Sequence, residues 1–367
     1  MPADELIRHG QHVMTVCNAC RYCEQYCPVF PAMEQRLTFA AADLTYLANL
    51  CHNCGECLYA CQYAPPHEFG IDVPRTLAKI RARSYEDYCW PQFLAFAFRR
   101  HNLLTGAGLA AGLVALMLAA TLVVNGGTLP RPAGTGDFYA VVPHDVMVAL
   151  FGGVFLFALA ALWIGAVRLW RDMNMEGAAA PARDVRALGR ALRDVLTLRH
   201  LHGSGADCTS AEETRTPWRR WFHHCTFYGL LSCFASTTVA AIYHAVFGWQ
   251  APYAYTSLPV LLGTAGGAGL LVGLAGLLME RRRRDPSLRD PAQDGLDQSF
   301  IALLFLAALT GLLLLALRER AVMSVLLIVH LGVVLALFLT LPYGKFVHGI
   351  YRTAALVKYA REHLRVS

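Results

Sequence analysis

The sequence predicts an all-α chain in two parts: a small cysteine-rich domain of helices and loops, followed by a bundle of six membrane-spanning helices. Hydrophobic residues form 56% of the 367 residues and charged residues only 16%, whereas an ordinary soluble domain carries about 25% charged residues. Several apolar runs reach the roughly 20 residues that a bilayer core requires. Eight of the 12 cysteines fall in two tight clusters near the N-terminus.

The first part, residues 1–102, is polar and contains both cysteine clusters. It has no apolar segment of the kind that forms the centre of a secretory signal peptide. We therefore expect this domain to stay in the cytoplasm, where thiols remain reduced and can bind metal.

The two cysteine clusters share one spacing, C-x2-C-x2-C-x3-C. This is the run of bacterial ferredoxins, in which the fourth cysteine of each run ligates the cluster of the other run. Structural zinc sites instead combine C-x2-C units over a longer gap, and disulfides are not expected in the cytoplasm. We therefore predict a ferredoxin-like domain with two [4Fe–4S] clusters. One is expected on Cys17, Cys20, Cys23 and Cys61, and the other on Cys51, Cys54, Cys57 and Cys27.

The second part, residues 103–367, contains six apolar runs that hold no Lys, Arg, Asp or Glu. Because unpaired backbone groups are costly in lipid, each run is expected to cross the bilayer as a helix. The pairs Gly108–Gly112 and Gly269–Gly273 have the spacing of closely packed membrane helices. The six runs are Leu103–Val124, Val146–Val167, Cys225–Phe247, Leu258–Met279, Phe300–Leu317 and Ala321–Leu341.

The distribution of positive charge predicts the orientation of this bundle. Only three of the 32 Lys and Arg residues lie on one side of the membrane, and the other 29 lie on the opposite, cytoplasmic side. Both termini are then cytoplasmic, and the chain is expected in the bacterial inner membrane. Since topology explains the net charge of +6, no nucleic-acid partner is expected. The three residues on the minority side are Arg131, Arg318 and Arg320.

The cytoplasmic loop 168–224 is too long to be a plain connector. Within it, Arg183–Leu201 carries apolar residues at helical spacing with arginines between them. Two interpretations stay open: an amphipathic helix at the membrane interface, or a surface helix packed on the soluble domain.

Five histidines lie in or beside the membrane runs, where ionisable residues indicate functional sites. Neutral imidazoles between helices are the natural axial ligands of b-type haem. Alternatively, some of these histidines are interfacial polar residues at helix ends. The five are His223, His224, His244, His330 and His348.

Helix geometry predicts two histidine pairs at two depths, and therefore one haem or two. His223 and His224 precede His244 by about 30 Å of helix. His330 and His348 are 18 residues apart, which is five turns, or about 27 Å, along one unbroken helix. A kink at Pro342, between the two histidines, would invalidate this argument. We expect His223 or His224 opposite His348 at the inner depth, and His244 opposite His330 at the outer depth.

The twin cysteine runs, HHCTFYG at 223–229, CFAST at 233–237 and PYGKFVHG at 342–349 together resemble the tricarballylate utilization protein B family, or CitB domain family. The last stretch also resembles the haem-binding end of the nitrate reductase gamma subunit. The resemblance implies a membrane partner for an FAD-dependent flavoprotein that oxidises tricarballylate to cis-aconitate. It also implies that electrons pass from the flavin through iron–sulfur clusters and haem b.

The chain shows no phosphate-binding loop and no dinucleotide fingerprint, so we expect an electron-transfer component rather than a complete enzyme, with no catalytic residue of its own. Electrons are expected to end on membrane quinone. A membrane reductase, such as one in cobalamin biosynthesis, and a redox sensor are the alternatives.

Overall fold

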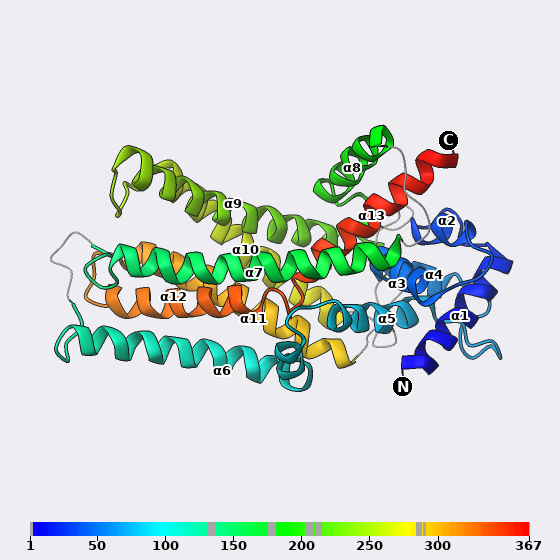
Figure 1. Cartoon of the computed structure of the whole chain (residues 1–367), viewed down its shortest axis with the longest axis horizontal. Helices are drawn as coiled ribbons and strands as arrows, with labels where there is room; N and C mark the ends of the chain where they lie inside the picture. Colours follow the sequence, from blue (N-terminus) through cyan, green and yellow to red (C-terminus); the bar gives the residue numbers. More distant parts are fainter. Residues whose placement is uncertain are drawn as a thin grey trace.

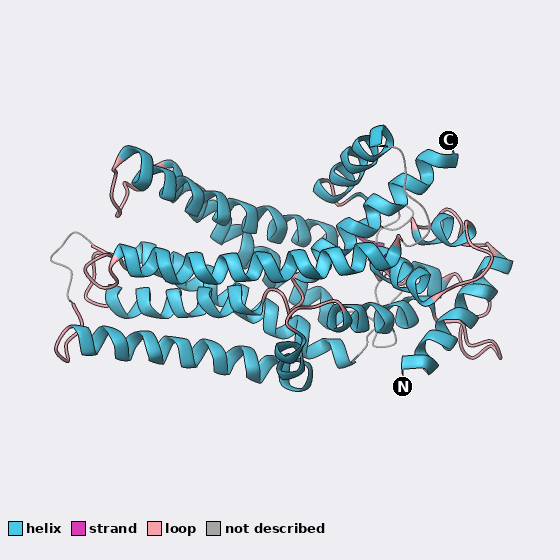
Figure 2. Cartoon of the chain, viewed as in Figure 1, coloured by secondary structure: helices cyan, strands magenta, loops and turns pink. Residues whose placement is uncertain are grey.

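A computed structural model describes residues 3–130, 137–174, 181–202, 208–209, 215–283, 288 and 291–366. Almost all of the described chain is helical, apart from one antiparallel pair of two-residue strands, β1 (Cys208–Thr209) and β2 (Arg215–Thr216) (Figure 2). The molecule is elongated, with a long helical bundle at one end and a cluster of shorter helices at the other (Figure 1). Both chain termini lie at the end with the shorter helices.

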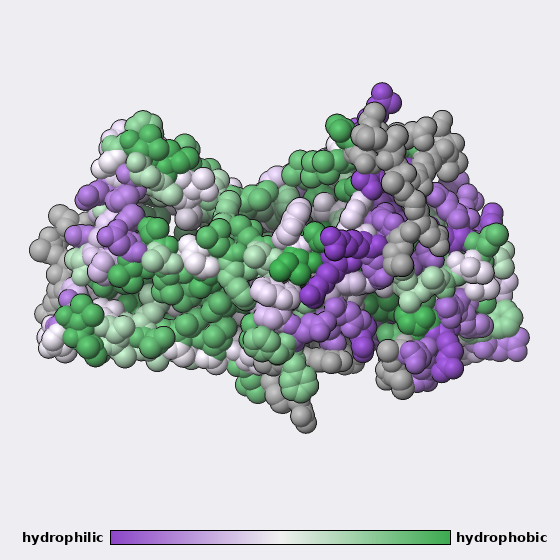
Figure 3. Space-filling view, in the orientation of Figure 1, coloured by the Kyte–Doolittle hydropathy of each residue, from purple (hydrophilic) through white to green (hydrophobic). Residues whose placement is uncertain are grey.

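The prediction of six helices long and apolar enough to cross a membrane is confirmed. Hydrophobic residues cover the bundle, and hydrophilic residues gather at the other end of the molecule (Figure 3). The six helices are α6 (Gln92–Val124), α7 (His144–Met173), α9 (Trp218–Phe247), α10 (Leu258–Arg283), α11 (Pro291–Leu317) and α12 (Met323–Thr340).

Five short helices form the N-terminal domain, and two more elements and a C-terminal helix lie beside it (Figure 1). The N-terminal helices are α1 (Ala3–Cys20), α2 (Val29–Glu34), α3 (Ala41–Leu50), α4 (Glu56–Tyr59) and α5 (Val73–Asp87). The others are α8 (Pro181–Leu196), the 3-10 turn η1 (Arg199–His202) and α13 (Val347–Val366).

The core of the N-terminal domain extends into the second part of the chain. Its buried residues from α1, α3 and α5 form one hydrophobic cluster with residues of α7 and α13, such as Leu169, Tyr351 and Ala355. Helix α6 also runs without interruption through residue 102, where the composition changes. The two predicted parts are therefore joined by shared packing as well as by the chain.

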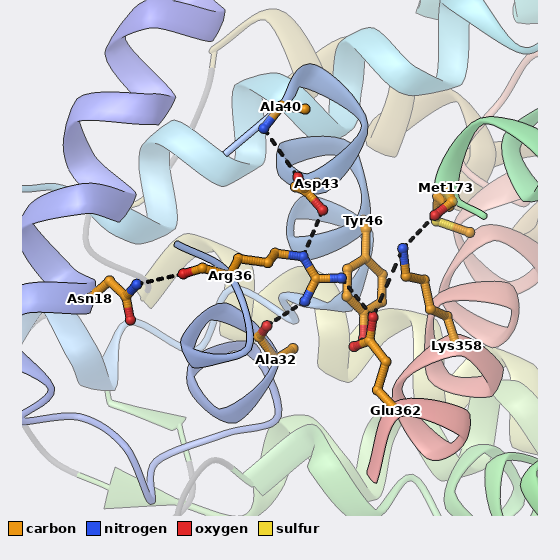
Figure 4. Close-up of polar contacts among 9 residues, drawn as sticks. All are labelled: Asn18, Ala32, Arg36, Ala40, Asp43, Tyr46, Met173, Lys358 and Glu362. Atoms are coloured by element: carbon orange, nitrogen blue, oxygen red, sulfur yellow. Dashed lines mark hydrogen bonds and ion pairs between the residues drawn. The ribbon is translucent and has the colours of Figure 1, made fainter. Parts of the chain in front are cut away.

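Polar contacts among side chains of α3, the α2–α3 connection and α13 reinforce this junction (Figure 4). The Glu362 carboxylate of α13 accepts a hydrogen bond of 2.6 Å from Arg36 Nη2 and one of 2.9 Å from the Tyr46 hydroxyl. Arg36 also contacts Asp43 at 2.6 Å, and Lys358 donates to the carbonyl of Met173 at the end of α7. Side chains from α3, the α2–α3 connection and α13 thus meet around one carboxylate.

The expectation that His330 and His348 share one helix is wrong. Helix α12 ends at Thr340, and α13 begins at Val347 after a series of turns. Pro342 explains the break, because proline has no N–H and its ring clashes with the carbonyl four residues earlier. The argument from five helical turns therefore does not apply to this pair.

Helices α9 and α10 pack closely through glycine. A Cβ on Gly273 would lie 2.6 Å from the backbone nitrogen of Thr226, so no larger residue fits there. The expected close packing is thus confirmed at Gly273. It is wrong at Gly108 and Gly112, where a Cβ would meet no atom of the described residues within 4 Å.

Candidate functional site

The cysteines of the first predicted set lie around one cavity. This cavity has a volume of about 230 Å³ and is lined by Cys17, Cys20, Cys23, Cys57 and Cys61. Burial raises the pKa of the Cys17 thiol to about 12, and the next causes are the neighbouring thiols of Cys61, Cys23 and Cys20. Cys61, the fourth cysteine of the second run, therefore lies beside the first three cysteines of the first run.

The second set surrounds a narrower cavity of about 20 Å³, lined by Cys27, Cys51, Cys54 and Cys57. Burial raises the pKa of Cys27 well above its usual value, and the neighbouring thiols of Cys54 and Cys51 raise this pKa further. The chain thus brings the cysteines together in the crossed arrangement that the spacing predicts. Since Cys57 borders both cavities, the two sets are close neighbours.

Short helices and left-handed turns bend the chain around these cavities. Helix α1 ends at Cys20, and Arg21 follows with φ 55°. In the second run, Gly55 has φ 91°, and a Cβ there would lie 2.5 Å from Leu288. A residue with a side chain is disfavoured at Gly55 by both conformation and space.

The donor chemistry fits iron–sulfur clusters better than a single metal ion. No three His, Cys, Asp or Glu side chains of the described residues converge closely enough to hold one ion. Four sulfurs on a cluster bind four different irons, so they lie farther apart than four sulfurs on one zinc. Crowded, buried thiols also resist ionisation, and bound iron would supply the positive charge that stabilises their thiolates.

Three arginines stand around the second set. Arg81 donates to the carbonyl of Cys51 at 2.6 Å. Arg352 of α13 lies among the same groups: burial lowers its pKa to about 10, while the thiols of Cys51 and Cys27 oppose that shift. The third, Arg219, comes from the membrane bundle.

Arg219 ties the membrane bundle directly to the second cysteine run. From the first turn of α9, its guanidinium donates to the carbonyls of His52 and Asn53, both at 3.1 Å. The Asn53 amide in turn donates to the carbonyl of Leu288, between α10 and α11, at 3.3 Å. The loop between Cys51 and Cys54 is therefore held by several parts of the second half of the chain.

One turn after Arg219, His223 meets His348 of α13. Their ring centres are 6.2 Å apart and their planes are inclined by 70°. With metal–nitrogen bonds of about 2 Å on both sides, two imidazoles on one iron have ring centres about 6 Å apart. The spacing therefore fits an iron between them.

Both rings have a nitrogen available. The Nδ1 atom of His223 is buried and has no hydrogen-bond partner among the described residues. His348 Nδ1 lies 2.5 Å from the carbonyl of Lys345, so this nitrogen carries the proton and leaves Nε2 for a ligand. Burial, followed by the charges of Lys345 and His223, lowers the pKa of His348 to about 3, which keeps the imidazole neutral.

The structure separates His224 from this pair. Its ring stacks on Tyr228, with centres 5.8 Å apart, and also contacts Trp221. Trp221 and Tyr228 are both exposed on the outside of α9. Of the two alternatives for the inner position, the geometry therefore favours His223.

The outer histidines have other neighbours than the predicted ones. His330 lies 3.0 Å from the hydroxyl of Thr310 on α11. His244 stacks on His144, the first residue of α7, with ring centres 3.9 Å apart, and contacts Tyr139. The pairing of His244 with His330 stays a prediction.

Comparisons with known proteins now bear on this arrangement. The family model described as "Citrate utilization protein B" matches residues 98–367, and the model of its Fer4-like domain matches residues 10–87. A citrate utilization protein B of Escherichia coli is 48% identical over 356 residues, which are 97% of this chain and 92% of the relative. The chain belongs to the citrate utilization protein B family. No solved structure matches it.

Sequence reasoning missed two groups of residues in this member of the family. His144 lies just outside an apolar run, directly after Pro143, so only its stacking on His244 draws attention to it. Arg219 and Arg352 read as ordinary positive residues at the cytoplasmic ends of helices. Their position at the second cysteine set depends on contacts between distant segments, for which the sequence carries no signal.

Proposed function

We propose that this citrate utilization protein B family member is a membrane electron-transfer subunit. By resemblance, it would reoxidise a cytoplasmic flavoprotein that converts tricarballylate to cis-aconitate, and deliver the electrons to quinone. Two [4Fe–4S] clusters, held by the two cysteine sets, and b-type haem would supply one-electron redox chemistry. The haem would be held by His223 and His348, with His244 and His330 as the candidate ligands of a second.

One observation supports this proposal most directly. Arg219 donates hydrogen bonds to the loop of the second cysteine set, and it lies only one helical turn before His223 in α9. A four-residue separation is about 6 Å of helix, so the second cluster would lie next to the histidine pair. The order of sites is then first cysteine set, second cysteine set, His223 with His348.

The direction of electron flow follows from charge. Arg81, Arg219 and Arg352 place positive charge at the second set and stabilise its reduced, more negative state. Arg219 and Arg352 also lie near His223, where the carboxylates of a haem would require cationic partners. A reduced flavin releases two electrons and two protons, and this chain would pass the electrons one at a time to a quinone, which takes up two of each.

The test uses the purified full-length protein in lipid nanodiscs, with photoreduced FMN as donor and decylubiquinone as acceptor. We expect about eight non-haem iron and eight sulfide per chain, a low-spin haem spectrum, and haem reduction followed by quinol formation. In Cys54→Ser, reduction of the haem by FMN should slow by at least about tenfold, since about 1.4 kcal/mol suffices for that change. Zinc without sulfide, or unchanged haem reduction in this variant, would contradict the proposal.

A further inference from the structure

Helix α8 presents three different faces to its surroundings. One face is buried and packs on α13. The second is apolar and exposed, and the third carries exposed arginines. The buried face comprises Ala187, Ala191 and Asp194. The apolar residues, here called the α8 stripe, are Val185, Leu188, Leu192 and Leu196, which are 73%, 47%, 44% and 46% exposed. The arginines are Arg186, Arg190 and Arg193.

The α8 stripe ends at the level of the membrane surface. The carbonyl of Leu196 accepts a hydrogen bond of 2.7 Å from the Tyr228 hydroxyl of α9. Tyr228 lies about 15 Å along α9 from Trp218. Trp218 and Trp221 are 55% and 56% exposed at the start of that helix, and exposed tryptophans at helix ends mark the lipid–water interface. The end of α8 is therefore no farther from the bilayer than this tryptophan pair.

Figures 1 and 3 agree with this position. Helix α8 lies beside the inner part of α9 and above α13 (Figure 1). In the space-filling view, hydrophobic surface continues from the bundle toward α8 (Figure 3). The exposed apolar face of α8 is thus an extension of the surface that lipid covers.

Charge identifies the lipid that suits this face. Four large apolar side chains in a row on a single helix are unfavourable in water. Beside them, Arg186, Arg190 and Arg193 form a positive edge. This combination is typical of helices that lie in the interface plane of anionic membranes.

We propose that α8 is an in-plane membrane anchor that inserts the α8 stripe at the boundary of headgroups and acyl chains and binds anionic phospholipid through Arg186, Arg190 and Arg193. One face of α8 would then lie on lipid, as the first interpretation of this segment expected, while another face packs on α13 rather than on the N-terminal helices. Because α8 rests on α13, the anchor would also hold the helix that carries His348. The proposal does not depend on clusters or haem.

The test is hydrogen–deuterium exchange of residues 185–196 in the full-length protein, held in nanodiscs of phosphatidylglycerol, nanodiscs of phosphatidylcholine, or detergent. Each arginine near an acidic surface contributes about a fivefold gain in affinity. We expect exchange to be slower in phosphatidylglycerol than in phosphatidylcholine by about tenfold or more, and fastest in detergent.

Two sets of variants separate the contributions. The triple variant Arg186→Gln, Arg190→Gln, Arg193→Gln leaves the α8 stripe and the buried face intact, and should abolish the difference between the two lipids. Leu188→Gln with Leu192→Gln should speed exchange in both lipids. Leu37→Gln and Arg8→Gln, at exposed positions of the N-terminal domain, are the matched controls and should change nothing.

Equal exchange in all three environments would overturn the proposal. So would protection that appears in detergent and grows with protein concentration, since a second copy would then cover the stripe. Protection that requires an added flavoprotein would assign the stripe to a protein partner instead.

Discussion

Arg219 on α9 donates a 3.1 Å hydrogen bond to the carbonyl of His52, which lies between the first two cysteines of the second run. This contact joins segments 167 residues apart. It places the start of a membrane helix against the loop that holds half of the candidate redox ligands. The junction between the two halves of the chain is therefore also the step between two candidate redox centres.

Replacing Arg219 by Ala should loosen this junction. Two carbonyls would lose a charged donor, at a cost of about 1–3 kcal/mol. We expect iron and haem content to stay near wild type while haem reduction by photoreduced FMN slows, as measured by stopped-flow absorption. Arg220→Ala, the neighbouring arginine, is the control and should keep the wild-type rate. Equal slowing in both variants would mean that Arg219 has no special role.

The crossed arrangement of cysteines makes a prediction that an uncrossed one does not. Cys27→Ser should remove the same EPR signal as Cys54→Ser, while Cys61→Ser should remove the same signal as Cys20→Ser. Each variant should lose about four of the eight cluster irons. Cys89, buried away from both sets, provides the control, since Cys89→Ser should keep all the iron. If Cys27→Ser and Cys20→Ser affect one signal, the arrangement is wrong.

The adjacent histidines of α9 offer a matched comparison. His223→Ala and His348→Ala should each convert the inner haem from low-spin to high-spin, or lose it, because one strong-field ligand is removed. His224→Ala should retain the full spectrum, since that ring stacks on Tyr228. Reduced-minus-oxidised spectra of membranes measure the outcome. Loss of haem in His224→Ala alone would reverse the assignment.

Arg352→Gln should lower the reduction potential of the second cluster. A positive charge near the thiolates stabilises the reduced state by about 1–2 kcal/mol at an effective dielectric constant near 20, which corresponds to about 40–90 mV for one electron. Redox titration followed by EPR measures this shift, and the first cluster should move less. Arg83→Gln, at an exposed position paired with Asp87, should leave both potentials unchanged. Equal shifts of both clusters in Arg352→Gln would indicate a general structural effect.

Glu362→Gln should weaken the attachment of α13 to the N-terminal domain. Arg36 and Glu362 are only 11% and 14% exposed, so breaking their pair costs more than breaking a surface pair, and we expect about 2–4 kcal/mol. Thermal unfolding in detergent measures the loss. Asp87→Asn, which breaks the exposed Arg83–Asp87 pair, should cost less than about 0.5 kcal/mol. Similar losses in both variants would show that the buried carboxylate is not a strong attachment.

The sequence alone determined the features that depend on local pattern. Apolar runs of sufficient length specify membrane helices wherever they lie in the chain, because each helix satisfies its own backbone hydrogen bonds. All six are present, and the repeated cysteine spacing likewise predicted which thiols would meet, since that spacing is a property of each run. The break before α13 lies at Pro342, which the sequence already marks as a point where the helix can kink, whereas the argument from the 18-residue separation of His330 and His348 assumed one unbroken helix.

Only the tertiary structure decided how these elements meet. His223 and His224 are adjacent and chemically identical, and only the position of the start of α13 in the folded chain brings His223, and not His224, to His348. Arg219 and Arg352 likewise acquire their places at the second cysteine set through contacts between segments far apart in sequence. A pattern within one helix determines which face is apolar, but the partner of each polar side chain depends on the three-dimensional arrangement of several helices.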